Sequence, residues 1–453
     1  MIVVWLRRDL RLADNPALAD AAARGAIVPV FVLDPRLRGR SERRDAWFAA
    51  TLAALDRQLR LHGARLVIRR GDPIGELVQV AREVGATGVW WNRDATPYAR
   101  QRDATAESAF RAAALEPRSF ADATLSEPSS VVPARGGFYT IFTPFFRAWL
   151  GGVRLPPAPA PPRIRMPGNV RTLPPPEPTV DALPSAGERS ARAAVTRFVD
   201  GALGTYAARR DRLDDDPTSR LSPYLRVGAL SPRQVYAEVV AAAARDRRVV
   251  SSADAFIRQL AWRDFFVQIL WHAPATRWKP LRPPRAALRW RGDAGALAAW
   301  QAGRTGYPVV DAAMRQLAAT GFIANRARMI AASFLVKHLL VDWRDGDRWF
   351  MCQLLDGDPA LNGGNWQWVA SVGADALPAF RIFNPVTQGR RFDPTGTYVR
   401  RWVPELASAG PIDVHAPWET GGVAAYPPPI VEHAAARRRA LAAFGAGLSA
   451  LSR

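Results

Sequence analysis

The stretch IVVWLRRDLRLADNPALADAAARGAIVPVFVL, residues 2–33, decides the fold of the first part of the chain. A short apolar run around Trp5 is followed by a helical pattern that starts at Pro16, and a second apolar run starts at Ile27. Short apolar runs predict buried strands, and two such runs joined by a helical segment predict a βαβ unit with parallel strands. The stretch therefore predicts the start of a parallel sheet covered by helices.

The same alternation continues to about residue 125. We expect strands at residues 3–6, 27–33, 66–70 and 88–92, and helices at residues 16–23, 46–61, 73–84 and 97–115. Such an order is typical of a doubly wound α/β domain. A G-x-G-x-x-G turn and a P-loop are both missing, which argues against the usual dinucleotide and nucleoside-triphosphate sites.

Proline and then helical patterns dominate the rest of the chain. Residues 155–184 hold 11 of the 38 prolines, and proline cannot continue a helix, so an extended connector is expected there. Further on, the run from Ser231 to Gln234 has the pattern of a capping box, and residues 252–272 predict a long helix with an apolar stripe. We expect an α/β domain at 1–130, a linker at 131–187 and an all-helical domain at 188–453.

Composition narrows the class of protein. Lys+Arg 62 against Asp+Glu 41 gives a formal net charge of +21, which favours binding to nucleic acid, although the arginine bias of a GC-rich genome would give the same excess. The hydrophobic share of 48% excludes a disordered chain. A single cysteine, Cys352, excludes an intramolecular disulfide and a multi-cysteine zinc site, and the histidines lack ligand spacing, so no metal is expected.

The start of the chain does not resemble a signal peptide, because its apolar run precedes its charges. No uncharged stretch reaches the roughly 18 residues that a membrane-spanning helix needs. We therefore expect a cytoplasmic protein without a membrane partner.

One helix face could line a ligand pocket. Gln259, Trp262, Arg263 and Phe266 are spaced three and four residues apart, so they share one side of the predicted helix. An aromatic ring, an amide and a guanidinium together suit a flat, polar ligand. The alternative is that Trp262 packs in the core while Arg263 extends along the surface.

Two further clusters could bind ligand groups. Hydroxyls and an arginine at residues 218–222 precede a helix start, where phosphate can bind, although capping by Ser222 would also explain them. Asp356 and Asp358 could hold magnesium, cap a helix or accept hydrogen bonds from a ribose or ring. Trp366 and Trp368 flank a glutamine and could stack on an unpaired base or belong to the core.

Together these stretches resemble the photolyase/cryptochrome family of flavoproteins, most closely the class I cyclobutane pyrimidine dimer (CPD) photolyases. The resemblance runs from residue 1 to about 435, with the family's motifs in the family's order. It is carried by WLRRDLRL at 5–12 with DN at 14–15, residues 218–225, WRDF at 262–265, TGYP at 305–308, DAAMR at 311–315, DGD at 356–358, residues 364–368 and RIFNP at 381–385.

The resemblance implies that FAD binds in the helical domain. The positions that match the family's flavin contacts are Tyr206, Thr218, Ser219, Arg220, Leu221, Ser222, Arg263, Asn325, Arg328, Asp356, Gly357, Asp358 and Asn362. Among these, Asn362 matches the residue that faces flavin N5.

The resemblance also implies the reaction and its residues. Trp290, Trp343 and Trp366 match the family's electron-transfer triad and, with Asn362 and Gln259, are the expected catalytic residues. Photoexcited reduced FAD would donate an electron to a pyrimidine dimer, which then splits and returns the electron. The damaged pair would leave the duplex and enter a pocket.

Seven positions match the family's contacts to the lesion: Arg210, Gln259, Trp262, Asn325, Met329, Trp368 and Gln388. The expected partner is UV-damaged DNA with a flipped pyrimidine dimer, and the protein is expected to be a monomer.

The chain departs from the family's pattern at several positions. Gln259 stands where CPD photolyases typically have glutamate, and it can donate a hydrogen bond but is no comparable acid. Glutamine is also found there in (6-4) photolyases and some cryptochromes, yet the (6-4) enzymes use a histidine pair where this chain has Asn325 and Met329. The family's folate-antenna residues are not recognisable near residues 92–103, so a deazaflavin-type antenna or none is expected.

The function expected from the resemblance is light-dependent DNA repair by a deoxyribodipyrimidine photo-lyase. A cryptochrome-type blue-light photoreceptor is the first alternative, and the end of the chain at Arg453, soon after the region of resemblance, favours the photolyase. We also consider a (6-4) photolyase and a basic nucleic-acid-binding protein that has lost its flavin.

Overall fold

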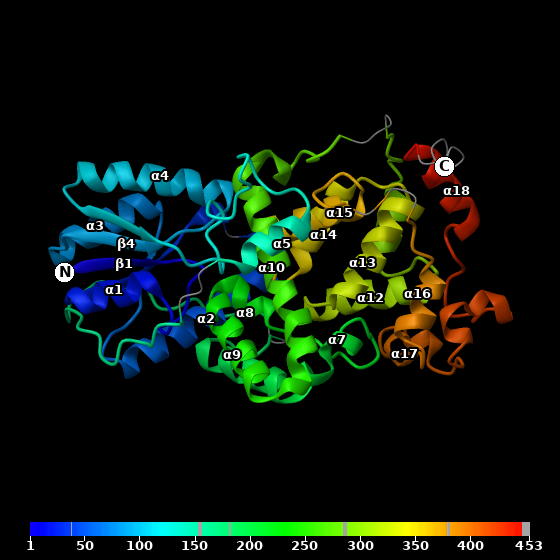
Figure 1. Cartoon of the computed structure of the whole chain (residues 1–453), viewed down its shortest axis with the longest axis horizontal. Helices are drawn as coiled ribbons and strands as arrows, with labels where there is room; N and C mark the ends of the chain where they lie inside the picture. The colour runs from blue at the N-terminus through cyan, green and yellow to red at the C-terminus, as the bar shows by residue number, and fades with distance from the viewer. Residues whose placement is uncertain are drawn as a thin grey trace. The chain divides into compact units, whose positions relative to one another are not determined.

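The computed structural model describes residues 1–37, 39–152, 156–180, 183–283, 288–376, 378 and 381–445. Contacts divide the chain into two units, which are described separately (Figure 1). Unit 1 comprises Met1–Tyr139, Thr143–Ala207 and Ser219–Pro274, and unit 2 comprises Thr140–Phe142, Ala208–Thr218 and Ala275–Arg453. The division predicted at residues 130 and 187 stays a prediction.

Unit 1 is built on a five-stranded parallel sheet of order β3-β2-β1-β4-β5. Its strands are β1 (Ile2–Leu6), β2 (Ile27–Leu33), β3 (Val67–Arg70), β4 (Gly88–Asn92) and β5 (Glu116–Phe120). Register places Trp5 beside Val30 on one side and Trp91 on the other. The predicted parallel sheet is confirmed.

The fifth strand was missed because its sequence lacks an apolar run. β5 reads EPRSF and pairs only with β4, so it lies at the edge of the sheet. An edge strand tolerates proline and charged side chains, since one of its sides makes no ladder hydrogen bonds. Because Pro117 and Arg118 interrupt the hydrophobic pattern, the sequence does not predict this strand.

Helices cover both faces of the sheet. α1 (Pro16–Arg24) and α2 (Glu42–Leu61) lie on one face, and α3 (Pro73–Val84) and α4 (Pro97–Ala112) lie on the other (Figure 1). This placement is what right-handed crossovers on either side of β1 require. Side chains that cap the backbone fix the starts of these helices: Asn15, Ser41, Asp72 and Thr96. The cap at Ser41 explains why α2 begins before the predicted residue 46.

The remaining helices of unit 1 follow the sheet in the chain. They are α5 (Phe142–Leu150), α6 (Glu188–Arg197), the short α7 (Tyr206–Arg209), which ends in unit 2, α8 (Ser222–Val227), α9 (Pro232–Arg245) and α10 (Val250–His272). A π-helical turn, Phe198–Ala202, follows α6. The described part of the proline-rich stretch contains no helix or strand, while Leu155, Asp181 and Ala182 lie outside the described residues. The predicted long helix is α10.

Unit 2 is helical throughout its described residues. Its helices are α11 (Ala294–Gln301), α12 (Pro308–Thr320), α13 (Asn325–Ser333), α14 (Trp343–Gln353), α15 (Pro359–Val369), α16 (Pro385–Phe392), α17 (Thr397–Trp402) and α18 (His433–Ala443), with a π-helical turn at Phe334–His338. Asp311 of α12 anchors the core by accepting hydrogen bonds from the backbone of Thr305 and Gly306 and from the Tyr426 hydroxyl. A parallel-sheet domain followed by a helical domain is the fold class that the sequence predicted.

None of the helices in the described parts of the chain is long and apolar enough to span a bilayer.

The capping box at the start of α9 is confirmed and offers a test of the fold. Ser231 accepts a hydrogen bond from the Gln234 backbone N–H and donates one to buried Asp14. We expect Ser231→Ala to lower the free energy of unfolding by about 2 kcal/mol, because a cap and a buried hydrogen bond are both lost. Urea unfolding measures the change.

The matched control is Ser108→Ala, since Ser108 is an exposed α4 residue whose hydroxyl bonds only its own helix. We expect that substitution to change the unfolding free energy by less than about 0.5 kcal/mol. Equal effects of the two substitutions would contradict the account of the α9 cap.

Candidate functional site

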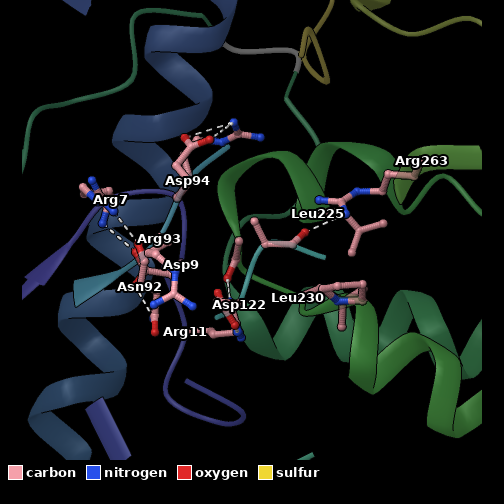
Figure 2. Close-up of a pocket in the computed structure, with 14 residues that line it drawn as sticks. Arg7, Asp9, Arg11, Asn92, Arg93, Asp94, Asp122, Leu225, Leu230 and Arg263 are labelled. Atoms are coloured by element: carbon pink, nitrogen blue, oxygen red, sulfur yellow. Dashed lines mark hydrogen bonds and ion pairs between the residues drawn. The ribbon is translucent and has the colours of Figure 1, made fainter. Parts of the chain in front are cut away.

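A small pocket lies in unit 1 at the carboxyl ends of three adjacent strands. Arg7 and Arg8 follow β1, Arg93 and Asp94 follow β4, and Asp122 follows β5. Ligands of open α/β sheets usually bind at such a strand end, where the strand order reverses. Figure 2 shows the charged side chains of this pocket turned toward one another.

These charges satisfy each other. Arg7 pairs with Asp103 at 2.5 Å, Arg8 with Asp94 at 3.2 Å, and Arg11 with Asp122 at 2.5 Å. The pocket has a volume of about 30 Å³, which is room for about two water molecules. Sites for drug-sized ligands are roughly 300 Å³ or larger. The pocket is therefore a small polar space lined by paired charges.

Helix α10 places three predicted site residues in unit 1. Arg263 donates to the carbonyl of Ala123 at 2.6 Å and lines the small pocket. Trp262 stacks on Phe266 with ring centroids 5.6 Å apart. Gln259 donates to the carbonyl of Ala255 one turn earlier at 3.3 Å. The predicted shared face exists, and its aromatic rings pack on each other.

The other predicted positions of unit 1 precede α10. Tyr206 packs edge-on against Phe198 and Phe256 with centroids 5.6 and 5.2 Å apart. Capping of α8 by Ser222 is wrong, because Ser222 is the first residue of that helix and the N-cap position is Leu221. Arg220 has a φ of 51°, which is uncommon for a residue with a side chain. Thr218 falls in unit 2, so the predicted run 218–222 is divided between the two units.

In unit 2, charged partners join α13 to the start of α15. Arg328 of α13 pairs with Asp356 at 2.8 Å and donates from Nε to the carbonyl of Ile323 at 2.9 Å. Asp358 caps α15 by accepting from the backbone N–H groups of Ala360 and Leu361. Of the interpretations of the two aspartates, the helix cap is confirmed for Asp358, while Asp356 forms an ion pair.

Helix α14 provides the hydrogen-bond acceptors for the side chain of Asn362. Its Nδ2 lies 2.6 Å from Oδ1 and 3.0 Å from the backbone oxygen of Asp347. Arg277 donates to the other oxygen of the same carboxylate at 2.6 Å. Burial raises the pKa of Asp347, and the charge of Arg277 and the hydrogen bonds counteract it. No motif in the sequence indicates a role for Asp347 or Arg277. The one available signal is that Asp347 lies one helical turn after Trp343.

Trp366 lies one helical turn after Asn362 on α15, and its ring is buried. The ring stands edge-on to Phe350 and Trp300, with centroids 5.0 and 6.1 Å away. Gly346 of α14 makes room for it, because a Cβ at that position would lie 2.2 Å from the indole. The core interpretation of Trp366 is confirmed, and this placement is also compatible with electron transfer.

The other two tryptophans of the predicted triad also belong to unit 2. Trp343 is buried at the start of α14, with the Arg344 guanidinium 4.8 Å from its ring centroid. Trp290 is half-buried and packs edge-on against Phe444 at 6.2 Å. Trp366 and Trp343 are thus both buried, whereas Trp290 is closer to solvent.

The remaining predicted lesion contacts also lie in unit 2. Asn325 donates to Met329 Sδ at 3.4 Å, one turn along α13. Trp368 is partly buried against the core, and Arg210 is half-buried. Gln388 has a buried Oε1 that receives no hydrogen bond from the described residues. An unused buried acceptor of this kind fits a site that a ligand completes.

Among the residues that the structure describes, no group of His, Cys, Asp and Glu side chains is arranged to hold a metal ion.

The geometry agrees with the comparisons to known proteins. The profile described as DNA photolyase matches residues 2–163, and that described as FAD binding domain of DNA photolyase matches residues 256–446. The chain belongs to the DNA photolyase family, and FAD is its cofactor.

Individual relatives are similar over nearly the whole chain. A deoxyribodipyrimidine photo-lyase of Agrobacterium fabrum is 41% identical, with 98% of each chain covered. The crystal structure of a class III photolyase from Agrobacterium tumefaciens has a TM-score of 0.93 and 39% identity, covering 98% of this chain and 97% of that one. A Synechocystis cryptochrome has a TM-score of 0.89 and 29% identity, covering 97% and 98%.

The close approach of Gly346 to Trp366 yields a testable prediction. Gly346→Ala places a methyl group 2.2 Å from the indole ring of Trp366 and forces the ring to move. We expect a loss of stability of about 1–3 kcal/mol from overpacking and a roughly tenfold or greater loss in the rate of flavin photoreduction, because small displacements of reacting groups lower rates strongly. Illumination with an external reductant measures that rate.

Gly295→Ala is the control, because Gly295 lies in α11 of the same unit and its added Cβ would make only an ordinary contact, 3.6 Å from Asp293. We expect that variant to photoreduce at the wild-type rate. An unchanged rate in Gly346→Ala as well would show that photoreduction does not depend on the position of the Trp366 ring.

Proposed function

We propose that this protein is a deoxyribodipyrimidine photo-lyase that uses light to split cyclobutane pyrimidine dimers in DNA. The observation that carries the proposal is the relative of that name, 41% identical over 98% of each chain. The expected family, fold class and cofactor are all found. A repair enzyme acts where the DNA is, so we propose that the protein is cytoplasmic. The monomeric state stays a prediction.

FAD, when bound, supplies light absorption and one-electron transfer to the lesion. Within unit 2, the donor set fits such a cofactor, because Arg328 offers a cation beside Asp356, and Asn362 offers an amide oxygen that no described residue occupies. We assign these side chains to flavin binding. Tyr206, Ser219 and Arg263 of unit 1 are proposed as contacts by their match to the family's motifs.

The tryptophans of unit 2 are proposed to return electrons to the cofactor. An indole can lose an electron and pass the vacancy outward to a neighbouring indole. Trp366 begins the path in the interior and half-buried Trp290 ends it near solvent. Trp343 at the start of α14 stands between them in the proposed order.

The lesion is proposed to contact both aromatic and polar side chains. In unit 2, Trp368 would pack on the apolar side of the dimer, and the free Oε1 of Gln388 would accept a hydrogen bond from a base. Trp262 of unit 1 stays a predicted contact of the lesion. The net charge of +21 supports contacts to flanking phosphates, which position DNA without reading its sequence. We propose that the damaged pair is flipped out of the duplex.

A light-harvesting chromophore in the small pocket of unit 1 would need to break the ion pairs of Arg7, Arg8 and Arg11. A deazaflavin-type antenna, or none, stays a prediction. We propose FAD as the chromophore of the repair reaction.

The similarity to a solved cryptochrome favours one alternative, a blue-light photoreceptor with the same flavin. A (6-4) photolyase is disfavoured, because Asn325 and Met329 offer no acid where those enzymes use histidines.

Repair of a defined substrate separates these functions. Purified protein with reduced FAD is expected to restore an oligonucleotide that carries one thymine dimer under anaerobic blue light and to leave it unchanged in the dark. A protein that photoreduces its flavin but leaves the dimer intact would support the cryptochrome, and repair of a (6-4) photoproduct alone would support the other enzyme.

Gln259 provides a second prediction about the same reaction. A carboxylic acid can donate a proton or a strong hydrogen bond to a developing radical anion, and an amide cannot match that acidity. We expect Gln259→Glu to raise the repair yield per absorbed photon several-fold, without changing FAD content. The measurement is dimer loss against absorbed light dose.

Gln101→Glu is the control, because Gln101 is an exposed residue of α4, and we expect its repair yield to equal that of the wild type. A Gln259→Glu yield equal to or below wild type would rule out the assignment of Gln259 as a contact of the lesion.

A further inference from the structure

The chain contains two lysines, Lys279 and Lys337, among its 62 lysine and arginine residues. Lys279 is exposed, whereas Lys337 is fully buried in the π-helical turn Phe334–His338 of unit 2. Arginine keeps its charge at physiological pH, while a buried lysine can lose its proton. In a chain that uses arginine for almost every other cation, the one buried lysine offers what arginine lacks, a side chain that can be either charged or neutral.

The amine of Lys337 has one hydroxyl and one aromatic ring as partners. Its Nζ donates to Oγ of Ser371 at 2.9 Å and lies 3.5 Å from the ring centroid of Phe444. Among the described residues no carboxylate pairs with it, whereas Arg277 and Arg328 each lie beside an aspartate. A buried ammonium without a counter-ion is costly, so burial lowers the pKa of Lys337 to about 7.

The neighbouring ionisable groups leave the amine as the group that titrates beside Phe444. Nε2 of His338 lies 2.9 Å from Nδ1 of His433, and burial lowers the pKa of His338 to about 3 and also lowers the pKa of His433, so both rings are neutral at pH 7. Helices α13, α14 and α18 pack against the π-helical turn. The other ionisable side chains on or next to these helices and in the segment after Trp290 are Arg326, Arg328, Arg344, Asp345, Asp347, Arg348, Cys352, Glu432, Arg437, Arg438, Arg439 and Arg291. None of these adds to the effect of burial on the pKa of Lys337.

The ring that contacts the amine also contacts the proposed outer tryptophan. Phe444 directly follows α18 and packs edge-on against Trp290 with centroids 6.2 Å apart. The backbone N–H of Arg291 donates to the carbonyl of Leu340, which keeps the segment of Trp290 beside the π-helical turn. One aromatic ring thus contacts both the titratable amine of Lys337 and the indole.

A positive charge on Lys337 opposes the oxidation of Trp290. In the proposed path, one electron passes from Trp290 to oxidised Trp343, which leaves a positive charge on the Trp290 indole, and an external reductant later returns one electron to that indole. The distances to the shared ring limit the separation of amine and indole to about 10 Å, at which two unit charges repel by roughly a tenfold change in an equilibrium constant if the effective dielectric constant is about 20. A neutral amine exerts no such repulsion.

We propose that Lys337 is a proton-controlled charge that regulates electron transfer from Trp290, because its ammonium form opposes a positive charge on the indole and its neutral form permits one. The inference rests on the proposed function, in which Trp290 is the outer member of the electron-transfer path. The amine is charged below its pKa and neutral above it. Flavin photoreduction is therefore expected to become faster as the pH rises.

Lys337→Met tests the proposal, because methionine is of similar length and carries no charge. At each pH the photoreduction rate of the variant is divided by the wild-type rate, so that pH effects common to both proteins cancel. We expect a ratio of about five at pH 6 and about one at pH 8, since a pKa near 7 leaves about nine-tenths of the amines charged at pH 6 and about one-tenth at pH 8. A ratio that is equal at the two pH values, or larger at pH 8, would overturn the proposal.

Lys279→Met is the matched control, because it removes the exposed lysine of the same unit. We expect its ratio to the wild-type rate to be about one at both pH values, since solvent screens an exposed charge. A ratio for Lys279→Met that falls with pH as strongly as the ratio for Lys337→Met would indicate a general charge effect and overturn the specific role of Lys337.

The charge of the amine can be measured without photoreduction. Because the chain has two lysines, lysine labelled with ¹³C gives two Cε signals in an NMR spectrum of the FAD-loaded protein, and Lys279→Arg assigns them. We expect the Lys279 signal to titrate near pH 10 and the Lys337 signal near pH 7. A Lys337 amine that stays charged up to about pH 9 would overturn the proposal, even if Lys337→Met does not fold.

Trp290→Phe separates failure of the proposal from failure of the proposed function. A Trp290→Phe protein that photoreduces at the wild-type rate would overturn the electron path on which the proposal rests. Slow photoreduction in Trp290→Phe, together with a Lys337→Met ratio that does not change with pH, would overturn only the role of Lys337. A wild-type protein that repairs no dimer with chemically reduced FAD under blue light would overturn the proposed function itself.

Discussion

The packing of helix α14 against helix α15 is the constraint on which the candidate site of unit 2 depends. Two neighbouring residues of α14 set it: Gly346 has no side chain, so the Trp366 ring can lie against the helix, and Asp347 reaches Asn362 through hydrogen bonds. Asn362 and Trp366 are one turn apart on α15, so a single helix pair positions the amide and the first of the proposed electron donors. A shift of either helix would disturb both.

Paired charges make this arrangement possible in a strongly basic chain. Buried cations cost free energy unless a partner compensates them, and Arg277, Arg328 and Arg11 each lie beside an aspartate. The buried pairs serve positioning, because they orient side chains around a site or brace the strand ends. The excess of positive charge remains for the surface, where it can attract phosphate groups.

The sequence predicted most of the fold because its signals are local. Apolar runs located four strands, and caps such as Ser231 located helix starts, whereas β5 escaped because its edge position permits EPRSF. The residues of the candidate site were harder to predict from the sequence than the fold. The resemblance supplied Asn362 and Trp366, but Asp347 and Gly346 owe their roles to contacts between two helices, and spacing along the chain does not reveal such contacts.

The central claim is that α14 fixes the amide of Asn362 so that its oxygen is left for the proposed flavin. Neutron diffraction from an anaerobic crystal with reduced FAD tests it directly, because neutrons locate the hydrogens that distinguish the amide nitrogen from its oxygen. The account predicts both Nδ2 hydrogens on Asp347 and Oδ1 about 3 Å from N5. An amide with its NH₂ group toward N5 would contradict it.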